Sequence, residues 1–160
     1  MQYLTALAAL LGLAAAAART TAPSGALVVG SSGDYDTIQD AVDALDTSSS
    51  SEQSIFIQAG TYKEQVYIQE LSGPLSIYGY TEDTSSYASN KVTISSGLSQ
   101  DDGLDNDGTA TLRVWTSDFK LYNVNVENSY GEGSQALALS ASAGVSRTLP
   151  KNQITLLTIS

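Results

Sequence analysis

The sequence predicts an all-β domain, and a parallel β-solenoid fits it better than an antiparallel sandwich, the other architecture left open. One amphipathic helical pattern comes first and no second one follows, so βαβ units are not expected. Short alternating strands rich in Val, Ile, Tyr and Thr come next, with loops of varied length between them. A solenoid explains both features, because its coils stack on one another and a helix can cap the first coil.

The first eighteen residues have the pattern of a secretory signal peptide. An apolar segment from Leu4 to Leu13 precedes an alanine run that ends at Ala18. Small residues at alternate positions suit signal peptidase, and the apolar segment is too short to span a bilayer, which leaves a membrane anchor only as the alternative. We therefore predict a secreted, extracellular protein, with residues 1–18 as the signal, 19–144 as the folded domain and 145–160 as a tail outside the domain pattern.

The first elements of the domain are a buried strand over 26–30 and the single helix. Thr37 is the expected N-cap, with Asp40 three residues later in the capping-box position. The apolar residues that follow the cap recur at i, i+3, i+4 and i+7: Ile38, Ala41, Val42 and Leu45. This spacing predicts a short helix with one buried face.

A series of short strands is expected after the helix. They cover residues 54–57, 65–68, 75–80, 91–95, 110–114, 119–128 and 135–141. No Asn-Gly or Asp-Gly pair lies between two of them as a two-residue hairpin turn would require. Asn123, Asn125 and Asn128 suit the corners of a solenoid, where amide side chains can bond to the next coil, although asparagine is also common in ordinary loops.

Charge and composition exclude several classes of function. The formal net charge is −10 with only 7 basic residues, which argues against a nucleic-acid partner. The chain has no histidine and no cysteine, which removes Ser-His-Asp and thiolate nucleophiles and ordinary zinc sites. An enzyme with this composition would depend on carboxylates, Lys or Tyr. The domain must also be stable without disulfides.

The loop over 99–108 carries four aspartates and is the one segment that suggests a cation site. An EF-hand alignment fails, because Gly103 falls on the first ligand position and Val114 on the last. We interpret the loop as a solvated acidic surface. No metal and no cofactor are predicted.

Three segments resemble the pectin methylesterase (pectinesterase) family, most closely its secreted fungal members. They are "SSGDYDTIQDAVDAL" (31–45), "IFIQAGTYKEQVYI" (55–68) and "DGTATLRVWTSDFKLYNVNVENSYGEGSQALALSA" (107–141). The resemblance runs from about residue 26 to 144. It implies a right-handed parallel β-helix with an N-terminal capping helix, here incomplete at its C-terminal end. It also implies hydrolysis of the methyl esters of galacturonate units in pectin, with pectin as the partner and no cofactor.

The resemblance implies a mechanism that needs no histidine. One Asp attacks the ester, a second acts as acid and base, an Arg positions the nucleophile, and Gln side chains donate to the oxyanion. The first oxyanion Gln lies in a Gln-Ala-x-Ala-Leu strand, which here makes Gln135 the oxyanion stabiliser. Thr109 falls near a segment that lines the substrate groove, and we predict it as a substrate-binding residue.

The segments that carry the second Gln and both aspartates in the family should follow Gln135. No Asp or Glu follows Glu132, and "NQITLL" (152–157) echoes the second-Gln segment only faintly, with Ile154 where the Asp should be. We therefore expect this polypeptide to be inactive by itself. We also expect non-specific oligomers through an open solenoid end.

Three other hypotheses remain open. The chain could be a non-catalytic β-helix that binds pectin, or another polyuronide enzyme such as a lyase or polygalacturonase. The Gly-Thr-Tyr segment and the Gln135 strand argue against the lyase and the polygalacturonase. The third hypothesis is a fragment that arises from a misread coding region.

Overall fold

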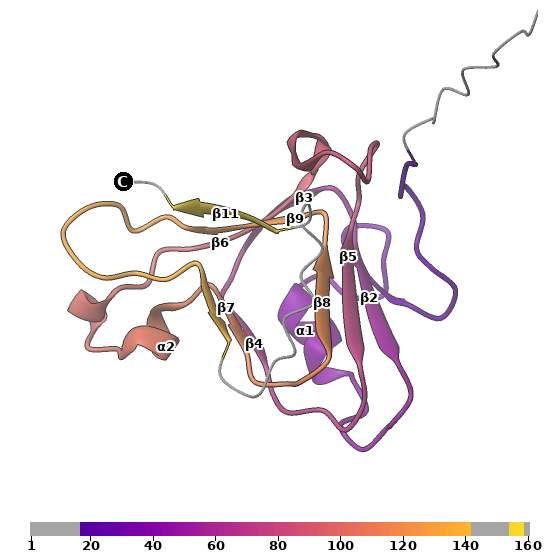
Figure 1. The fold of residues 1–160 in the computed structure, drawn as a ribbon, viewed down its shortest axis with the longest axis horizontal. Helices are drawn as coiled ribbons and strands as arrows, with labels where there is room; N and C mark the ends of the chain where they lie inside the picture. Colours follow the sequence, from indigo (N-terminus) through magenta and orange to yellow (C-terminus); the bar gives the residue numbers. More distant parts are fainter. Residues whose placement is uncertain (1–16, 142–153, 159–160) are drawn as a thin grey trace, which may run out of the picture.

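The computed structural model of the protein describes residues 17–141 and the main chain of 154–158. The chain winds through three sheets that form the three sides of a coil (Figure 1). All strand pairs within these sheets are parallel. The predicted parallel solenoid is therefore confirmed, and the antiparallel sandwich is wrong.

Each turn of the coil adds one strand to each sheet. Sheet 1 has the order β1 (Leu27–Val29), β2 (Gln53–Ile57), β5 (Leu75–Gly79), β8 (Phe119–Tyr122). Sheet 2 has the order β3 (Gly60–Lys63), β6 (Val92–Ser96), β9 (Val124–Asn128), β11 (Ile154–Thr158). Sheet 3 has the order β4 (Val66–Ile68), β7 (Leu112–Val114), β10 (Leu139–Ala141).

The core consists of aliphatic side chains that stack in register from one coil to the next. In sheet 1, Ile55 pairs with Ile77, which pairs with Leu121, and all three side chains are buried. Sheets 2 and 3 contribute equivalent columns, such as Val92 with Val124. Burial of one such side chain stabilises a fold by about 1.5–3 kcal/mol, so a column that repeats through the stack can replace disulfides.

Helix α1 (Ile38–Asp43) forms as the sequence predicts. The Thr37 hydroxyl accepts the main-chain N–H of Asp40 at 3.1 Å, which makes Thr37 the N-cap. Its buried face includes Ala41 and Val42. The helix packs against β1 and β2 of sheet 1 and against β4 of sheet 3, at the N-terminal end of the coil. Within residues 17–141 no helix is both long and apolar enough to cross a membrane.

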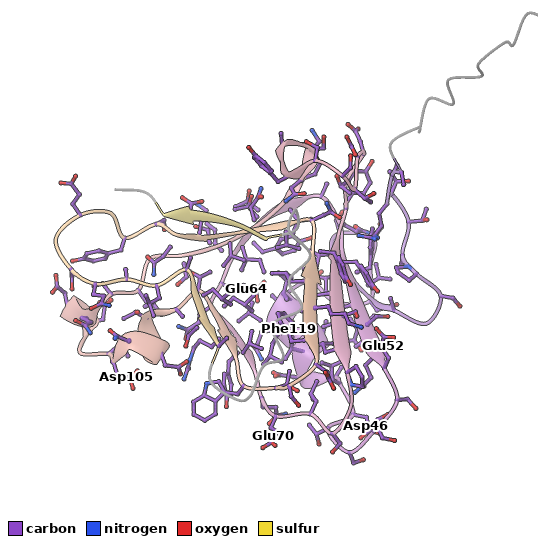
Figure 2. The ribbon with its side chains drawn as sticks, viewed as in Figure 1. Asp46, Glu52, Glu64, Glu70, Asp105 and Phe119 are labelled. Atoms are coloured by element: carbon purple, nitrogen blue, oxygen red, sulfur yellow. The ribbon has the colours of Figure 1, made fainter. Side chains whose placement is uncertain are left out.

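Glu64 ties this helix to the second coil. Its carboxylate accepts the N–H groups of Ile38 at 2.9 Å and Gln39 at 3.0 Å, and Figure 2 shows it beside α1. The Gln39 amide then accepts the N–H of Tyr67 at 2.8 Å and donates to its carbonyl at 3.2 Å. Gln39 thus pairs with the edge strand β4 as a further strand would, which satisfies an edge that the helix covers.

Some element boundaries differ from the prediction. Gly60 and the next three residues form strand β3, which is not among the expected strands, since they pair with β6 from the following coil. The expected strand over 119–128 is two strands, because Asn123 adopts a left-handed conformation with φ of 56°. Gly79 approaches this corner so closely that a Cβ would lie 2.2 Å from the Asn123 carbonyl oxygen. Only the last three residues of the expected strand over 135–141 form β10.

Three short elements lie in the loops between sheets. They are the 3₁₀ turns η1 (Tyr87–Ser89) and η2 (Gln100–Asp102) and the single-turn helix α2 (Asn106–Thr109). The last two occupy the acidic loop before β7. Helix α2 brings Asp107 against Arg113 of β7.

The corner asparagines bond between coils, as expected. The Asn128 amide donates to three main-chain carbonyls, those of Leu98 at 2.8 Å, Thr109 at 3.0 Å and Leu137 at 3.1 Å. Asn125 accepts from the side chain of Asn90 at 3.0 Å. Asn128 therefore joins the loop of one coil to the loop of the next.

Candidate functional site

The outer face of sheet 3 carries a row of polar and aromatic side chains. Tyr67 of β4, Arg113 of β7 and Ser140 of β10 lie in register across three coils. Their neighbours Leu112 and Val114 are buried in the core, so the alternation of the strands directs this row outward.

A cluster of four residues covers this face, and we call it the sheet 3 cluster: Tyr67, Asp107, Arg113 and Trp115. Arg113 donates to one Asp107 oxygen through Nε at 2.9 Å and Nη2 at 2.6 Å, and Trp115 Nε1 donates to the other at 3.3 Å. The Arg113 guanidinium also lies 4.8 Å from the ring centre of Tyr67. Tyr67 and Trp115 meet edge to face at 5.8 Å. Helix α2 supplies Asp107, so this short helix fixes the cluster.

The carboxylate of Asp107 is held in its ionised form. Burial alone would raise the pKa of Asp107, but hydrogen bonds from Ser140, Arg113 and Trp115, together with the charge of Arg113, outweigh it. The pKa therefore lies below its ordinary value of 3.8. Asp107 is thus unsuited to donate a proton at neutral pH, whereas the aromatic rings around it suit contact with a sugar ring.

Gln135 lies four residues before β10, on the side of sheet 3 where its strands begin. Its side chain is exposed, and its main-chain carbonyl accepts the N–H of Gln100 at 3.0 Å. Two residues later, Leu137 donates to the Thr109 hydroxyl at 3.3 Å and accepts from the Thr111 N–H at 3.0 Å. The segment is therefore anchored at the Gln135 carbonyl and at Leu137, while Gln135 is exposed to solvent.

Thr109 lies beneath this segment and has no exposed surface. Its hydroxyl donates to the Asn106 carbonyl at 2.9 Å and accepts from Leu137. A direct contact with substrate would require the Leu137 segment to move away. The geometry thus favours a supporting role for Thr109 over the predicted substrate contact, which stays a prediction.

The acidic loop is more ordered than the sequence suggested. Asp102 accepts the Ser99 N–H at 2.9 Å, Asp105 accepts the Gly108 N–H at 2.7 Å, and Asp101 accepts the Tyr130 hydroxyl at 2.5 Å. Asp107 belongs to the sheet 3 cluster. Across residues 17–141, no three His, Cys, Asp or Glu side chains are arranged to hold a metal ion.

Sequence reasoning missed Asp107 and Arg113 as members of a site. The available signal was the position of Arg113 in an alternating strand. A charged residue between the apolar residues Leu112 and Val114 is expected to face outward from the core. Nothing in the loop composition distinguished Asp107 from its three acidic neighbours.

Comparisons with known proteins agree on one family. The model of the family described as Pectinesterase matches residues 26–154. Pectinesterases of Aspergillus niger and Aspergillus aculeatus are each 54% identical to the chain, over 132 and 131 residues, which is 81% and 80% of this chain and 40% of each relative.

Solved structures give the same result. The pectin methylesterase of Aspergillus niger in deglycosylated form superposes with a TM-score of 0.75 at 50% identity, over 79% of this chain and 42% of that one. The pectin methylesterase from carrot superposes with a TM-score of 0.64 at 26% identity, over 77% and 38%. The chain thus spans about 40% of the length of the curated relatives it matches. The predicted domain boundary at 144 stays a prediction.

Proposed function

The chain belongs to the pectinesterase family, and we propose that it contributes the N-terminal part of a groove that binds pectin for hydrolysis of galacturonate methyl esters. The observation that carries this proposal is the exposure of Gln135, which stands on an anchored segment just before β10 of sheet 3. The sheet 3 cluster supplies aromatic surface on the same sheet.

Gln135 acts as a donor to the oxyanion of the tetrahedral intermediate in this proposal. A neutral amide stabilises a developing negative charge without giving up a proton. Such a donor is effective only if it is held in place before the reaction. The Gln135 carbonyl accepts the Gln100 N–H, and Leu137 bonds to the Thr109 hydroxyl and the Thr111 N–H; these bonds restrain the main chain that carries Gln135.

The 160-residue polypeptide by itself is expected to bind pectin without hydrolysing it. No Asp or Glu follows Glu132, so the carboxylate segments that the family carries after this Gln are not among these residues. This observation favours pectin binding without catalysis as the second candidate function. Release of methanol from methylated pectin at a rate comparable with a full-length relative would contradict it.

Charge predicts which form of pectin is bound. The chain has a formal net charge of −10, and the one cation of the sheet 3 cluster, Arg113, is already paired with Asp107. De-esterified polygalacturonate is a polyanion and would be repelled. Methyl-esterified segments carry no such charge, so they should bind more tightly.

Trp115 provides a direct test. It is the only tryptophan of the chain, belongs to the sheet 3 cluster and is 42% exposed. We expect methyl-esterified oligogalacturonate to change Trp115 fluorescence saturably, and a de-esterified oligomer of equal length to do so only at higher concentration. A neutral glucan oligomer is the control. Equal responses to all three oligomers, or no response, would contradict the proposal.

Secretion is a further part of the proposal. Most of the expected signal peptide, residues 1–16, lies outside the described residues. Removal of residues 1–18 would place Arg19 at the N-terminus of protein collected from the medium, which N-terminal sequencing tests. Retention of Met1 in that protein would contradict it.

We also expect the protein to form non-specific oligomers through the end of the coil where β8 and β10 lie, and this stays a prediction. A monodisperse monomer in sizing chromatography would contradict it.

A further inference from the structure

The segment from Ala17 to Gly25 forms an N-terminal arm that lies against the outer side of sheet 1 (Figure 1). Arg19 fixes it through the main chain. The Arg19 N–H donates to the Thr81 carbonyl at 2.8 Å, and the Thr81 N–H donates back to the Arg19 carbonyl at 3.0 Å. This two-way bridge joins the arm to the residues that follow β5.

The Arg19 side chain lies over two tyrosines from successive coils. Its guanidinium carbon is 4.6 Å from the ring centre of Tyr78 and 5.6 Å from that of Tyr122. The two rings are register partners on β5 and β8 and stack on each other at 5.0 Å with an interplanar angle of 12°. One cation thus contacts two aromatic faces, an arrangement that favours a guanidinium.

A third group completes the site. Arg19 Nη1 donates to the Asn123 side-chain oxygen at 3.0 Å. Asn123 is buried, and its amide nitrogen donates to the Asn90 side chain at 3.2 Å, so the oxygen faces Arg19. Two stacked rings and a fixed amide oxygen form a small cage for a cation, and we call Tyr78, Tyr122 and Asn123 the arm-docking site.

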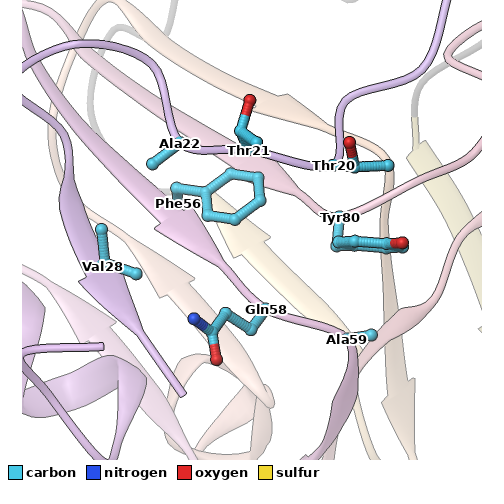
Figure 3. Close-up of a pocket in the computed structure, with 8 residues that line it drawn as sticks. All are labelled: Thr20, Thr21, Ala22, Val28, Phe56, Gln58, Ala59 and Tyr80. Atoms are coloured by element: carbon cyan, nitrogen blue, oxygen red, sulfur yellow. The ribbon is translucent and has the colours of Figure 1, made fainter. Parts of the chain in front are cut away.

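Between Thr20 and Gly25 the arm makes no main-chain hydrogen bond to sheet 1. Thr20, Thr21 and Ala22 of the arm line a cavity of about 600 Å³ together with residues of the sheet (Figure 3). Phe56 and Tyr80 lie on the sheet side of this cavity. Phe56 faces outward from β2 and is nevertheless buried, so this part of sheet 1 is covered, while the hydrogen bonds that hold the arm after Ala17 are those of Arg19.

We propose that the arm-docking site receives the N-terminal residue that processing after Ala18 exposes, and so holds the new N-terminus against sheet 1, away from aminopeptidases. This inference rests on the cleavage proposed above. The new α-ammonium of Arg19 takes the place of its amide N–H as donor to the Thr81 carbonyl, which makes that hydrogen bond charge-assisted. Ala17, whose carbonyl accepts the Thr84 N–H at 2.7 Å, leaves with the signal.

Amide hydrogen exchange tests the docking residue by residue. In a chain that begins at Arg19, the Thr81 amide should stay protected while the Thr84 amide exchanges rapidly. In the same chain, Arg19→Ala should raise the exchange rate of Thr81 at least tenfold. Arg19→Lys should give an intermediate rate, because it keeps the charge but loses the planar group.

Lys120→Ala is the matched control, since Lys120 is another cation on the outer face of β8 and pairs with Glu52 at 4.0 Å. Its effect on Thr81 should stay within twofold. Unchanged exchange of Thr81 in Arg19→Ala would overturn the proposal. Loss of amide protection at Ile77 and Leu121 in Arg19→Ala would also overturn it, because the arm would then be part of the folded core rather than a docked segment. N-terminal sequencing of secreted protein tests the cleavage separately.

Discussion

Replacement of Glu64 by alanine should release helix α1 from the second coil. The Glu64 carboxylate is half-buried and accepts two helix N–H groups, at 2.9 and 3.0 Å. These are groups that no residue within the helix can satisfy. The substitution therefore removes a charged partner from two donors and the negative charge from a helix N-terminus.

The magnitude follows from these bonds. A hydrogen bond to a charged group contributes about 1.5–3 kcal/mol, and partial exposure places both bonds near the lower end of that range. We expect Glu64→Ala to lower the free energy of unfolding by about 3 kcal/mol. Glu64→Gln keeps one acceptor oxygen and loses the charge, so about half of that loss is expected.

Urea unfolding followed by circular dichroism measures this effect. Glu70→Ala is the matched control, because Glu70 is an exposed carboxylate a few residues further on (Figure 2) and its removal relieves the net charge equally. The control should stay within about 0.5 kcal/mol of the natural chain. If Glu64→Ala lies within about 0.5 kcal/mol of that control, the structural role assigned to Glu64 is wrong.

Three further predictions concern packing, the corner network and pH. Gly79→Ala should destabilise the protein by about 3 kcal/mol, since its Cβ would meet the Asn123 carbonyl, whereas Gly97→Ala, whose nearest contact is 3.4 Å away, should cost less than about 1 kcal/mol in urea unfolding. Asn128→Ala leaves three carbonyls without their amide donor and should cost about 3 kcal/mol. Asn125→Ala removes only a 3.5 Å bond to the Thr93 hydroxyl and the bond from Asn90, so it should lower the free energy of unfolding by about 1 kcal/mol. Equal losses of stability in the two variants would refute the special role of Asn128. The folded-state pKa of Asp107 is lowered, so its stabilisation is present above its ordinary pKa of 3.8 and is lost as the pH falls below that value. The stability difference between the natural chain and Asp107→Asn should therefore shrink between pH 6 and pH 3, and a constant difference would contradict the assignment.

Local signals allowed the helix and most strands to be predicted. Thr37 and the spacing of Ile38, Ala41 and Val42 lie within a few residues of one another, and the structure forms the helix they indicate. Strand β3 could not be read in the same way. Gly60 and Thr61 resemble a turn by composition, and only pairing with β6, about thirty residues later, makes them a strand.

The site was predictable only in part, for a similar reason. Gln135 followed from the resemblance of its strand to a family, not from periodicity. The ion pair of Asp107 with Arg113 depends on a one-turn helix that brings the acidic loop over sheet 3. The contact of Arg19 with Asn123 joins residues 104 positions apart, a separation at which neighbours are set by the stacking of coils rather than by any local pattern.

A chimaera tests the proposed function most directly. Residues 26–141 would replace the corresponding part of the Aspergillus niger pectinesterase, which is 54% identical to this chain over 132 residues that make up 40% of its own length. We expect the chimaera to release methanol from methylated pectin. Gln135→Ala should lower kcat by about 100–1000-fold, as loss of one oxyanion donor does. Gln69→Ala, a change at an exposed glutamine after β4, should leave kcat unchanged. A folded chimaera that releases no methanol, or one in which Gln135→Ala is as active as Gln69→Ala, would contradict the proposal.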